Sequence, residues 1–247
     1  MTTSSIPTLL IVMGTSGSGK STVGSALSSA LSCPFVDGDD LHPPSNVEKM
    51  SRGQPLNDAD REPWLLRIRQ TGLQLATSQT ESPISPKKSE IGKVAEVLET
   101  SSTTKTSTDH VVATTRGQVG ENEVKGPSKH LAVIACSSLK LIYRRLLRGT
   151  ISSLQDPKAL QSEQEQPKDL RVVHVYLDLT RELLEERMSN RKGHFMKLDM
   201  LYSQLDTLQV PDEEAEMGVV RVKVERQTTT DEIIADVVDK LKDKSVI

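Results

Sequence analysis

The stretch Thr8-Leu-Leu-Ile-Val-Met-Gly14-Thr-Ser-Gly-Ser-Gly-Lys20-Ser-Thr22 decides the fold of this chain. Residues 8–13 are a continuous apolar run, which is typical of a strand buried on both faces. Residues 14–21 match Gly-x-x-x-x-Gly-Lys-Ser, and the residues that follow, up to 31, have the apolar spacing of a helix. A strand, this loop and a helix in that order predict a site that wraps the phosphates of a nucleoside triphosphate. The alternative, an ordinary Gly/Ser-rich turn, does not explain both flanking elements.

Each part of this loop has a physical role. The glycines let the backbone turn its N–H groups inward around a phosphate, and the helix N-terminus adds a favourable dipole. The Lys20 ammonium reaches the β- and γ-phosphates, and the Ser21 hydroxyl is a ligand for Mg²⁺. The residues predicted to bind the nucleotide are Gly14, Thr15, Ser16, Gly17, Ser18, Gly19, Lys20, Ser21 and Thr22.

Short apolar segments alternate with helical segments along the rest of the chain. This pattern predicts an α/β fold with a mostly parallel sheet of about five strands and helices on both faces. The predicted strands are residues 8–13, 34–37, 131–135, 172–177 and 219–224, and the predicted helices are residues 22–31, 62–77, 139–148, 180–190, 198–208 and 229–241.

Two polar segments interrupt the pattern. Residues 78–128 and 151–169 contain no Phe, Tyr or Trp, and Ser and Thr dominate the first part of the longer one. We interpret 78–128 as a disordered insertion and 151–169 as a second polar insertion. The other 177 residues are enough for one complete core, so residues 1–247 are expected to form a single domain.

Composition excludes several classes of protein. A net charge of −3 gives no electrostatic reason to expect a nucleic acid or an anionic membrane as partner. No apolar run approaches the roughly 20 residues of a membrane span, and the first residues lack the basic start of a signal peptide. Two cysteines cannot build a disulfide framework or a four-cysteine zinc site. A cytoplasmic location is therefore expected.

Two carboxylates follow the predicted strand at residues 34–37, in the string Asp37-Gly38-Asp39. Ligands of open α/β sheets bind beyond the carboxyl ends of strands. We assign Asp37, which is nearer the strand, to Mg²⁺, and Asp39 to the orientation and deprotonation of an acceptor hydroxyl. The sequence alone leaves the division of these two roles open, and a surface Asx turn is the plain alternative. Neither Asn-Lys-x-Asp nor Asp-x-x-Gly occurs, which argues against a GTPase.

A series of strings extends this site and carries a family resemblance. They are Gly14 to Ser21, Asp37-Gly-Asp-Asp-Leu-His42-Pro43, Asn46-Val-Glu-Lys49-Met50, Pro55-Leu-Asn57-Asp58-x-Asp60-Arg61-x-Pro63-Trp64, Cys136-Ser-Ser-Leu-Lys140-x-x-Tyr143-Arg144, Arg191-Lys-Gly193-His194-Phe195 and Gln204-Leu-x-Thr207-Leu208. Between about residues 8 and 245, outside the two polar segments, the chain resembles the small gluconokinases. One departure is Leu205-Asp206, where an aromatic and an acidic residue are usual.

The resemblance implies a nucleoside-monophosphate-kinase-like variant of the P-loop NTPase fold, with a small lid. It implies transfer of the γ-phosphate of ATP to the 6-hydroxyl of D-gluconate with Mg²⁺, and, in many members, a homodimer. Gluconate is a polyol carboxylate, so its site needs cations together with mixed donors and acceptors. The residues assigned to this substrate are Asp39, His42, Lys49, Arg52, Arg61, Lys140 and Arg144.

Plain alternatives exist for several of these residues. Lys140 and Arg144 are four apart on one predicted helix face, which suits a shared anion or a solvated basic face. His42 could be a loop histidine, and Lys49 and Arg52 could be charges at a helix end. Asp58 could pair with Arg61, and Trp64 is interpreted as a packing residue. Cys33 and Cys136 are interpreted as buried small residues.

A predicted lid supplies further cations. Arg187 and Arg191 are four apart on the helix that Thr180 can cap, and Gly193 permits a hinge. Arg191 is our first choice for stabilising the transferring phosphoryl group, and Arg187 is assigned to the nucleotide. Exposed helix cations are the alternative. Two other functions stay open: a related small kinase acting on shikimate or a nucleotide, and a nucleotide-binding regulatory or scaffold protein.

Overall fold

The computed structural model describes residues 6–78, 130–156, 165–190 and 195–247. The predicted insertion at 78–128 lies outside these ranges except for Ser78, and so do Arg191 and the predicted hinge at Gly193. The described residues belong to one compact unit, which comprises Met1–Thr80 and Gly126–Ile247.

Five parallel strands form one sheet in the order β2-β3-β1-β4-β5. They are β1 (Thr8–Met13), β2 (Phe35–Asp37), β3 (Leu131–Ala135), β4 (Arg171–Asp178) and β5 (Val219–Lys223). The strand β1 is central, and all six of its residues are buried. This position explains the unbroken apolar run before the phosphate loop, because helices cover both faces of the strand.

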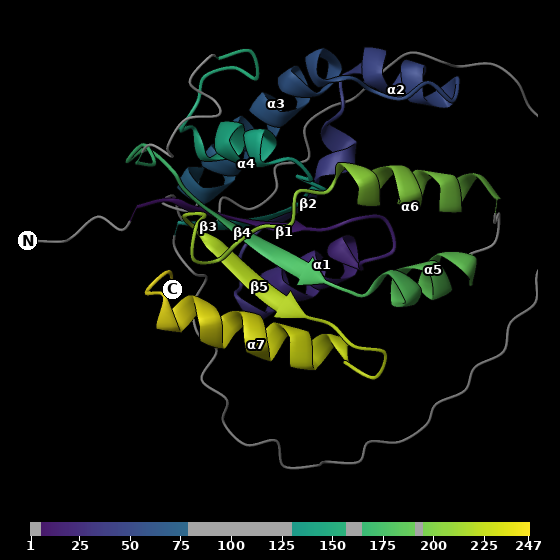
Figure 1. Cartoon of the computed structure of the whole chain (residues 1–247). Helices are drawn as coiled ribbons and strands as arrows, with labels where there is room; N and C mark the ends of the chain where they lie inside the picture. The colour runs from purple at the N-terminus through teal and green to yellow at the C-terminus, as the bar shows by residue number, and fades with distance from the viewer. Residues whose placement is uncertain (1–5, 79–129, 157–164, 191–194) are drawn as a thin grey trace, which may run out of the picture. The chain divides into compact units, whose positions relative to one another are not determined.

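The helices lie on the two faces of the sheet and beyond its carboxyl edge. In Figure 1, α1 (Lys20–Ala30) and α7 (Thr230–Asp243) lie below the sheet, and α3 (Asp58–Thr77) and α4 (Leu141–Arg148) lie above it. One apolar cluster joins Val23, Leu27 and Val237 to the lower face, and another joins Leu65 and Leu146 to the upper face. Beyond the carboxyl ends of the strands lie α5 (Arg181–Ser189) and α6 (Phe195–Thr207). The predicted P-loop α/β fold is confirmed.

Helix boundaries follow from capping residues. Thr229 and Glu232 form the predicted capping box of α7, and Thr180 caps α5 through the Leu183 N–H group. A capping box of Asn57 and Asp60 starts α3 four residues before the predicted start. The short helix α2 (Pro44–Ser51), which is not among the predicted helices, starts with Pro44 in its first turn, where proline needs no N–H partner.

The described ends of the segment 151–169 contact the core. Ile151 is buried, and Leu154 packs against the upper apolar cluster. The Gln166 side chain exchanges two hydrogen bonds with the backbone of Val172 on β4, at 2.8 and 3.1 Å. These flanks therefore extend the core, and only residues 157–164 of this segment lie outside the described structure.

Candidate active site

The phosphate loop runs from the end of β1 to the start of α1, as the sequence predicts. Gly19 precedes the helix with φ +95°, in the left-handed region that favours glycine. At Gly14, a Cβ atom would lie 2.8 Å from the Ser18 hydroxyl oxygen, so a side chain there would disturb the loop. The Lys20 ammonium lies over the loop and donates to the Thr15 carbonyl oxygen at 2.9 Å.

The two acids lie beside this loop. The Ser21 hydroxyl donates to the Asp37 carboxylate at 2.5 Å, and the Asp39 N–H group donates to the other carboxylate oxygen of Asp37 at 3.1 Å. No described residue donates a hydrogen bond to the Asp39 carboxylate. The two carboxylates are therefore inequivalent: Asp37 is fixed against Ser21, whereas Asp39 is available to a ligand.

A cavity of about 200 Å³ joins the loop to both acids. Its walls include Ser16, Lys20, Ser21, Asp37 and Asp39, and Met188 of α5 and Met200 of α6 close it from the lid side. A cavity with backbone N–H groups, one ammonium and two carboxylates suits a phosphate together with a divalent cation. Among the described residues, no three His, Cys, Asp or Glu side chains are grouped so that they could hold a metal on their own.

Trp64 on α3 positions the turn that carries the acids. Its indole N–H group donates to the Gly38 carbonyl oxygen at 2.7 Å, and its ring stacks on His42 with the centroids 4.1 Å apart. Burial lowers the pKa of His42, so its imidazole is neutral at pH 7. Trp64 is buried, as expected for a packing residue. Gly38 admits no side chain, since a Cβ atom would lie 2.4 Å from the Ala135 carbonyl oxygen.

The Asp58 carboxylate, at the start of α3, lies close to two of the cations predicted to bind the acceptor, Lys140 and Arg61. The Lys140 ammonium donates to this carboxylate at 2.8 and 3.0 Å, the Tyr143 hydroxyl donates at 2.5 Å, and Arg61 lies 3.9 Å away. Partial burial alone would raise the pKa of Asp58, but the hydrogen bonds from Lys140 and Tyr143 outweigh it and lower that pKa. Burial alone would lower the pKa of Lys140, but its interactions with Asp58 and Tyr143 together outweigh burial and raise that pKa. This ion pair is therefore fully charged at pH 7.

The two cations of α2 differ in their placement. Lys49 is half-buried and donates to the Asp60 carboxylate at 2.6 Å, close to the Asp58 cluster in sequence. Arg52 is exposed and pairs with Glu48 of its own helix. The structure therefore groups Lys49 with α3 but does not bring Arg52 to the other predicted substrate residues.

Arg144 requires a correction. Only 1% of its side chain is exposed, and its guanidinium makes two hydrogen bonds to Glu216, which also pairs with Arg148 at 3.3 Å. The expectation that Arg144 and Lys140 share one anion is wrong in this structure, because the helix turns the two side chains toward different partners. The burial of Arg144 gives it a structural role beneath the site.

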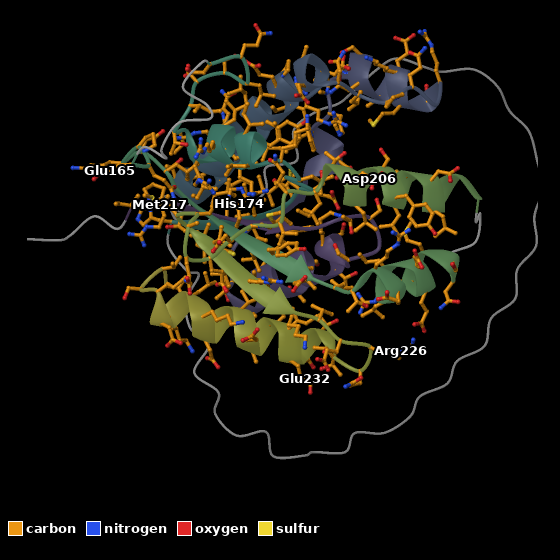
Figure 2. All side chains as sticks on the ribbon, viewed as in Figure 1. Glu165, His174, Asp206, Met217, Arg226 and Glu232 are labelled. Carbon is orange, nitrogen blue, oxygen red and sulfur yellow. The ribbon has the colours of Figure 1, made fainter. Side chains whose placement is uncertain are left out.

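His174 of β4 completes this buried cluster, and Figure 2 shows it in the interior of the fold. The Arg148 guanidinium lies 3.5 Å from its Nδ1 atom. Burial, together with Arg148 and Arg144, holds the pKa of His174 well below 6.5. The unfolded chain thus binds a proton below pH 6.5 that the folded chain does not, so this contribution to stability is full above pH 6.5 and is lost as the pH falls.

We expect the unfolding free energy to fall by about 1.4 kcal/mol per pH unit below pH 6.5 through His174. Urea unfolding at pH 7.5 and 5.5 measures the change, and His174→Gln, which cannot titrate, isolates it. An equal pH dependence in the wild type and this variant would contradict the assignment.

One residue of α5 and one of α6 contact the phosphate loop. The Arg187 guanidinium donates to the Ser18 carbonyl oxygen at 3.2 Å, so the structure places this side chain beside the phosphate loop. Gln204 of α6 accepts a hydrogen bond from the Ser16 N–H group at 2.6 Å. Gln204 belongs to the string Gln204-Leu-x-Thr207-Leu208, but no sequence pattern predicted this contact. Leu205, the departure from the usual aromatic residue, packs with Leu184 and Met188 between α5 and α6.

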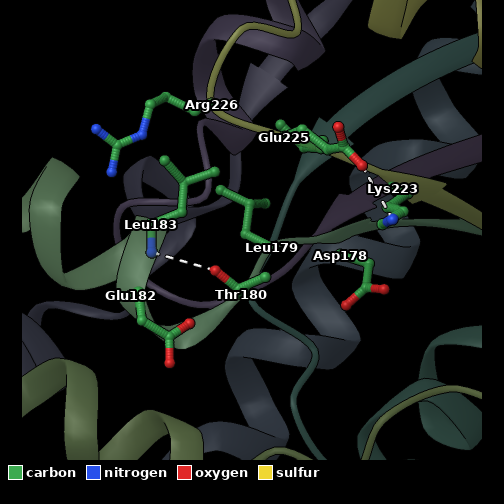
Figure 3. Close-up of a pocket in the computed structure, with 9 residues that line it drawn as sticks. Asp178, Leu179, Thr180, Glu182, Leu183, Lys223, Glu225 and Arg226 are labelled. Atoms are coloured by element: carbon green, nitrogen blue, oxygen red, sulfur yellow. Dashed lines mark hydrogen bonds and ion pairs between the residues drawn. The ribbon is translucent and has the colours of Figure 1, made fainter.

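A second cavity, of about 320 Å³, lies at the same edge of the sheet (Figure 3). Leu179 and Leu183 supply apolar walls from the β4–α5 turn and α5, and Glu225 and Arg226 come from the loop after β5. Leu183 lines this cavity, and Arg187, one helical turn further along α5, contacts the phosphate loop.

The fold and the site define a P-loop kinase. The chain is 34% identical to the gluconokinase of Gluconobacter oxydans over 89% of this chain and 84% of the relative, and 33% identical to the thermosensitive gluconokinase of Escherichia coli over 87% and 78%. A solved gluconokinase structure from Sinorhizobium meliloti superposes with a TM-score of 0.57 at 29% identity, covering 98% of this chain and 95% of that one. The chain belongs to the gluconokinase family.

The family model described as Shikimate kinase matches residues 16–79. This range holds most of the phosphate loop, the two acids and α3, and it ends before β3 and the helix that carries Lys140. The match therefore covers the first part of the predicted site, including Asp37, Asp39 and Arg61, but not Lys140.

Proposed function

We propose that this protein is an ATP-dependent gluconokinase that phosphorylates the 6-hydroxyl of D-gluconate. The observation that carries the proposal is the cluster of Lys140, Arg61 and Tyr143 around Asp58. It gives the acceptor side cations and hydroxyl partners in a family whose relatives are named gluconokinases. A polyol carboxylate requires both kinds of group.

On the donor side, the loop amides bind the triphosphate and Lys20 neutralises its terminal oxygens. Ser21 and Asp37 present two hard oxygen atoms 2.5 Å apart, and this donor set fits Mg²⁺. Bound there, Mg²⁺ would neutralise charge on the β- and γ-phosphates. Arg187 holds the loop through Ser18, and the cavity beside Leu183 is the proposed place for the base of the nucleotide.

On the acceptor side, Asp39 orients the 6-hydroxyl and takes its proton as the hydroxyl oxygen attacks the γ-phosphorus in line. The bond from the γ-phosphorus to the β–γ bridging oxygen breaks, and ADP leaves with that oxygen. Arg191, from the lid, is proposed to stabilise the equatorial oxygens of the phosphoryl group in the transition state. His42, Lys49, Arg61 and Lys140 are proposed to bind the hydroxyls and the carboxylate. No covalent intermediate is required, since positioning and electrostatics account for this type of catalysis.

The alternatives have less support. A nucleotide acceptor would stack on an aromatic ring, but Trp64 is only 4% exposed and is already stacked on His42. A scaffold protein would not need, beside the phosphate loop, an Asp39 carboxylate that accepts no hydrogen bond from any described residue. We also propose a cytoplasmic location, since the free thiols of Cys33 and Cys136 suit a reducing compartment, and a homodimer, as in many members of the family. Among the described residues, no helix has the length and apolar character to cross a membrane.

An assay of ADP release with a panel of sugar acids, shikimate and nucleoside monophosphates tests the function. We expect D-gluconate to give the highest kcat/KM. Lys140→Met should raise the KM for gluconate by about tenfold to a hundredfold, because a charged hydrogen-bond partner is lost, with little change in the KM for ATP.

Lys242→Met, at an exposed position on α7, is the matched control for loss of a lysine charge. An unchanged gluconate KM in Lys140→Met would remove Lys140 from the acceptor site. A higher kcat/KM for shikimate or a nucleotide would overturn the proposed substrate.

A further inference from the structure

Gln204, near the end of α6, and Gln209, just after that helix, contact two separate parts of the site. Gln204 accepts from the Ser16 N–H group of the phosphate loop at 2.6 Å. Gln209 donates its N–H group to the Leu139 carbonyl oxygen at 2.9 Å and accepts from the Leu141 N–H group at 2.6 Å. One helical turn links the two glutamines, since the Leu208 N–H group donates to the Gln204 carbonyl oxygen.

The contact with Leu139 and Leu141 fixes the start of α4. The first N–H groups of a helix have no partner within the helix, and Lys140, at the N-cap position, supplies no side-chain hydrogen bond. The Gln209 amide oxygen provides one of the missing acceptors. Because Leu139 and Leu141 flank Lys140, the two bonds to Gln209 also fix the backbone that carries this proposed substrate residue.

The contact with Ser16 fixes the phosphate loop from its lid side. Ser16 lines the phosphate cavity, and so does Met200, which lies one turn before Gln204 on α6. Leu201, fully buried, and Leu205 pack this helix onto Leu184 and Met188 of α5. The segment that bears Gln204 is thus held against α5 while its glutamine holds the loop.

We propose that residues 204–209 form a brace that couples the nucleotide half of the site to the acceptor half, with Gln204 and Gln209 as positioning residues. The proposal rests on the proposed function, since it assigns α4 to the acceptor. Its consequence is reciprocal. A change at Gln209, whose hydrogen bonds go to the start of α4, should weaken nucleotide binding at the phosphate loop, and a change at Gln204 should weaken acceptor binding.

Titration of a fluorescent ATP analogue, with no acceptor present, tests the first direction. Gln209→Met should weaken nucleotide binding about two- to tenfold, the range expected for one lost hydrogen bond. Gln209→Glu should restore it, because a carboxylate also accepts from the Leu141 N–H group and is favoured at a helix N-terminus. Val210→Ala, a change at an exposed neighbour, is the matched control.

Steady-state kinetics test the second direction. Gln204→Met should raise the gluconate KM at saturating ATP by a similar factor, and the double variant should lose no more than the larger single loss, since the two residues act as a unit. Ser203→Ala is the control on α6. Wild-type nucleotide affinity in Gln209→Met, or fully additive losses in the double variant, would overturn the brace. The nucleotide titration uses no acceptor, so it decides the brace even if gluconate proves not to be the substrate.

Discussion

Replacing Asp39 with Asn is expected to lower kcat by about two to four orders of magnitude, which is the usual contribution of a positioned general base. The amide keeps the shape of the carboxylate but cannot take the proton of the acceptor hydroxyl. Nucleotide affinity should change little, because Ser21, Asp37 and the loop amides remain in place. Single-turnover phosphorylation and titration of an ATP analogue measure the two quantities separately.

Two neighbouring variants make this result decisive. Asp40→Asn changes an exposed carboxylate next to Asp39 and should leave kcat near the wild-type value. Asp37→Asn should raise the Mg²⁺ concentration needed for half-maximal activity, because it removes a hard ligand beside Ser21. Near-normal turnover in Asp39→Asn with a severe loss in Asp37→Asn would exchange the roles of the two acids.

The fold was predictable because its signals are local. The run before Gly14 identified the central strand, the glycine spacing identified the loop, and Thr180 and Thr229 marked helix starts through their own backbone neighbours. The pairing of Ser21 with Asp37 was also within reach, since parallel strands bring their carboxyl ends to one edge of the sheet.

The rest of the site depends on contacts between residues distant in sequence. Asp58 meets Lys140 across 82 positions, and Arg144 meets Glu216 across 72. A basic pair four apart on a helix gives no indication that one member is buried, because burial depends on what packs over that helix. Glu216 lies in a loop with no apolar periodicity, so the sequence offered no pattern to identify it as the partner of Arg144. Helix α2 was not among the predicted helices; Pro44 lies in its first turn, where the missing N–H group costs no hydrogen bond.

The buried position of Arg144 leads to the second large effect. Glu216→Gln is expected to reduce the unfolding free energy by about 3–5 kcal/mol, because Arg144 and Arg148 lose the carboxylate that neutralises them in the interior. For a chain of this size, the melting temperature should fall by roughly 10 °C. Calorimetry or urea unfolding near pH 7.5 measures the loss.

The same variant separates a structural role for Arg144 from a role in binding substrate. At a temperature where Glu216→Gln is fully folded, its gluconate KM should lie within about threefold of the wild type, since no atom that contacts substrate has been changed. Glu213→Gln, which alters an exposed loop carboxylate 3.9 Å from Lys244, should have little effect on stability, because exposed ion pairs contribute little. If Arg144 binds the gluconate carboxylate instead, Arg144→Met will raise the gluconate KM strongly while Glu216→Gln leaves stability almost unchanged. That pair of results would restore Arg144 as a substrate-binding residue and would contradict its structural role in the buried cluster.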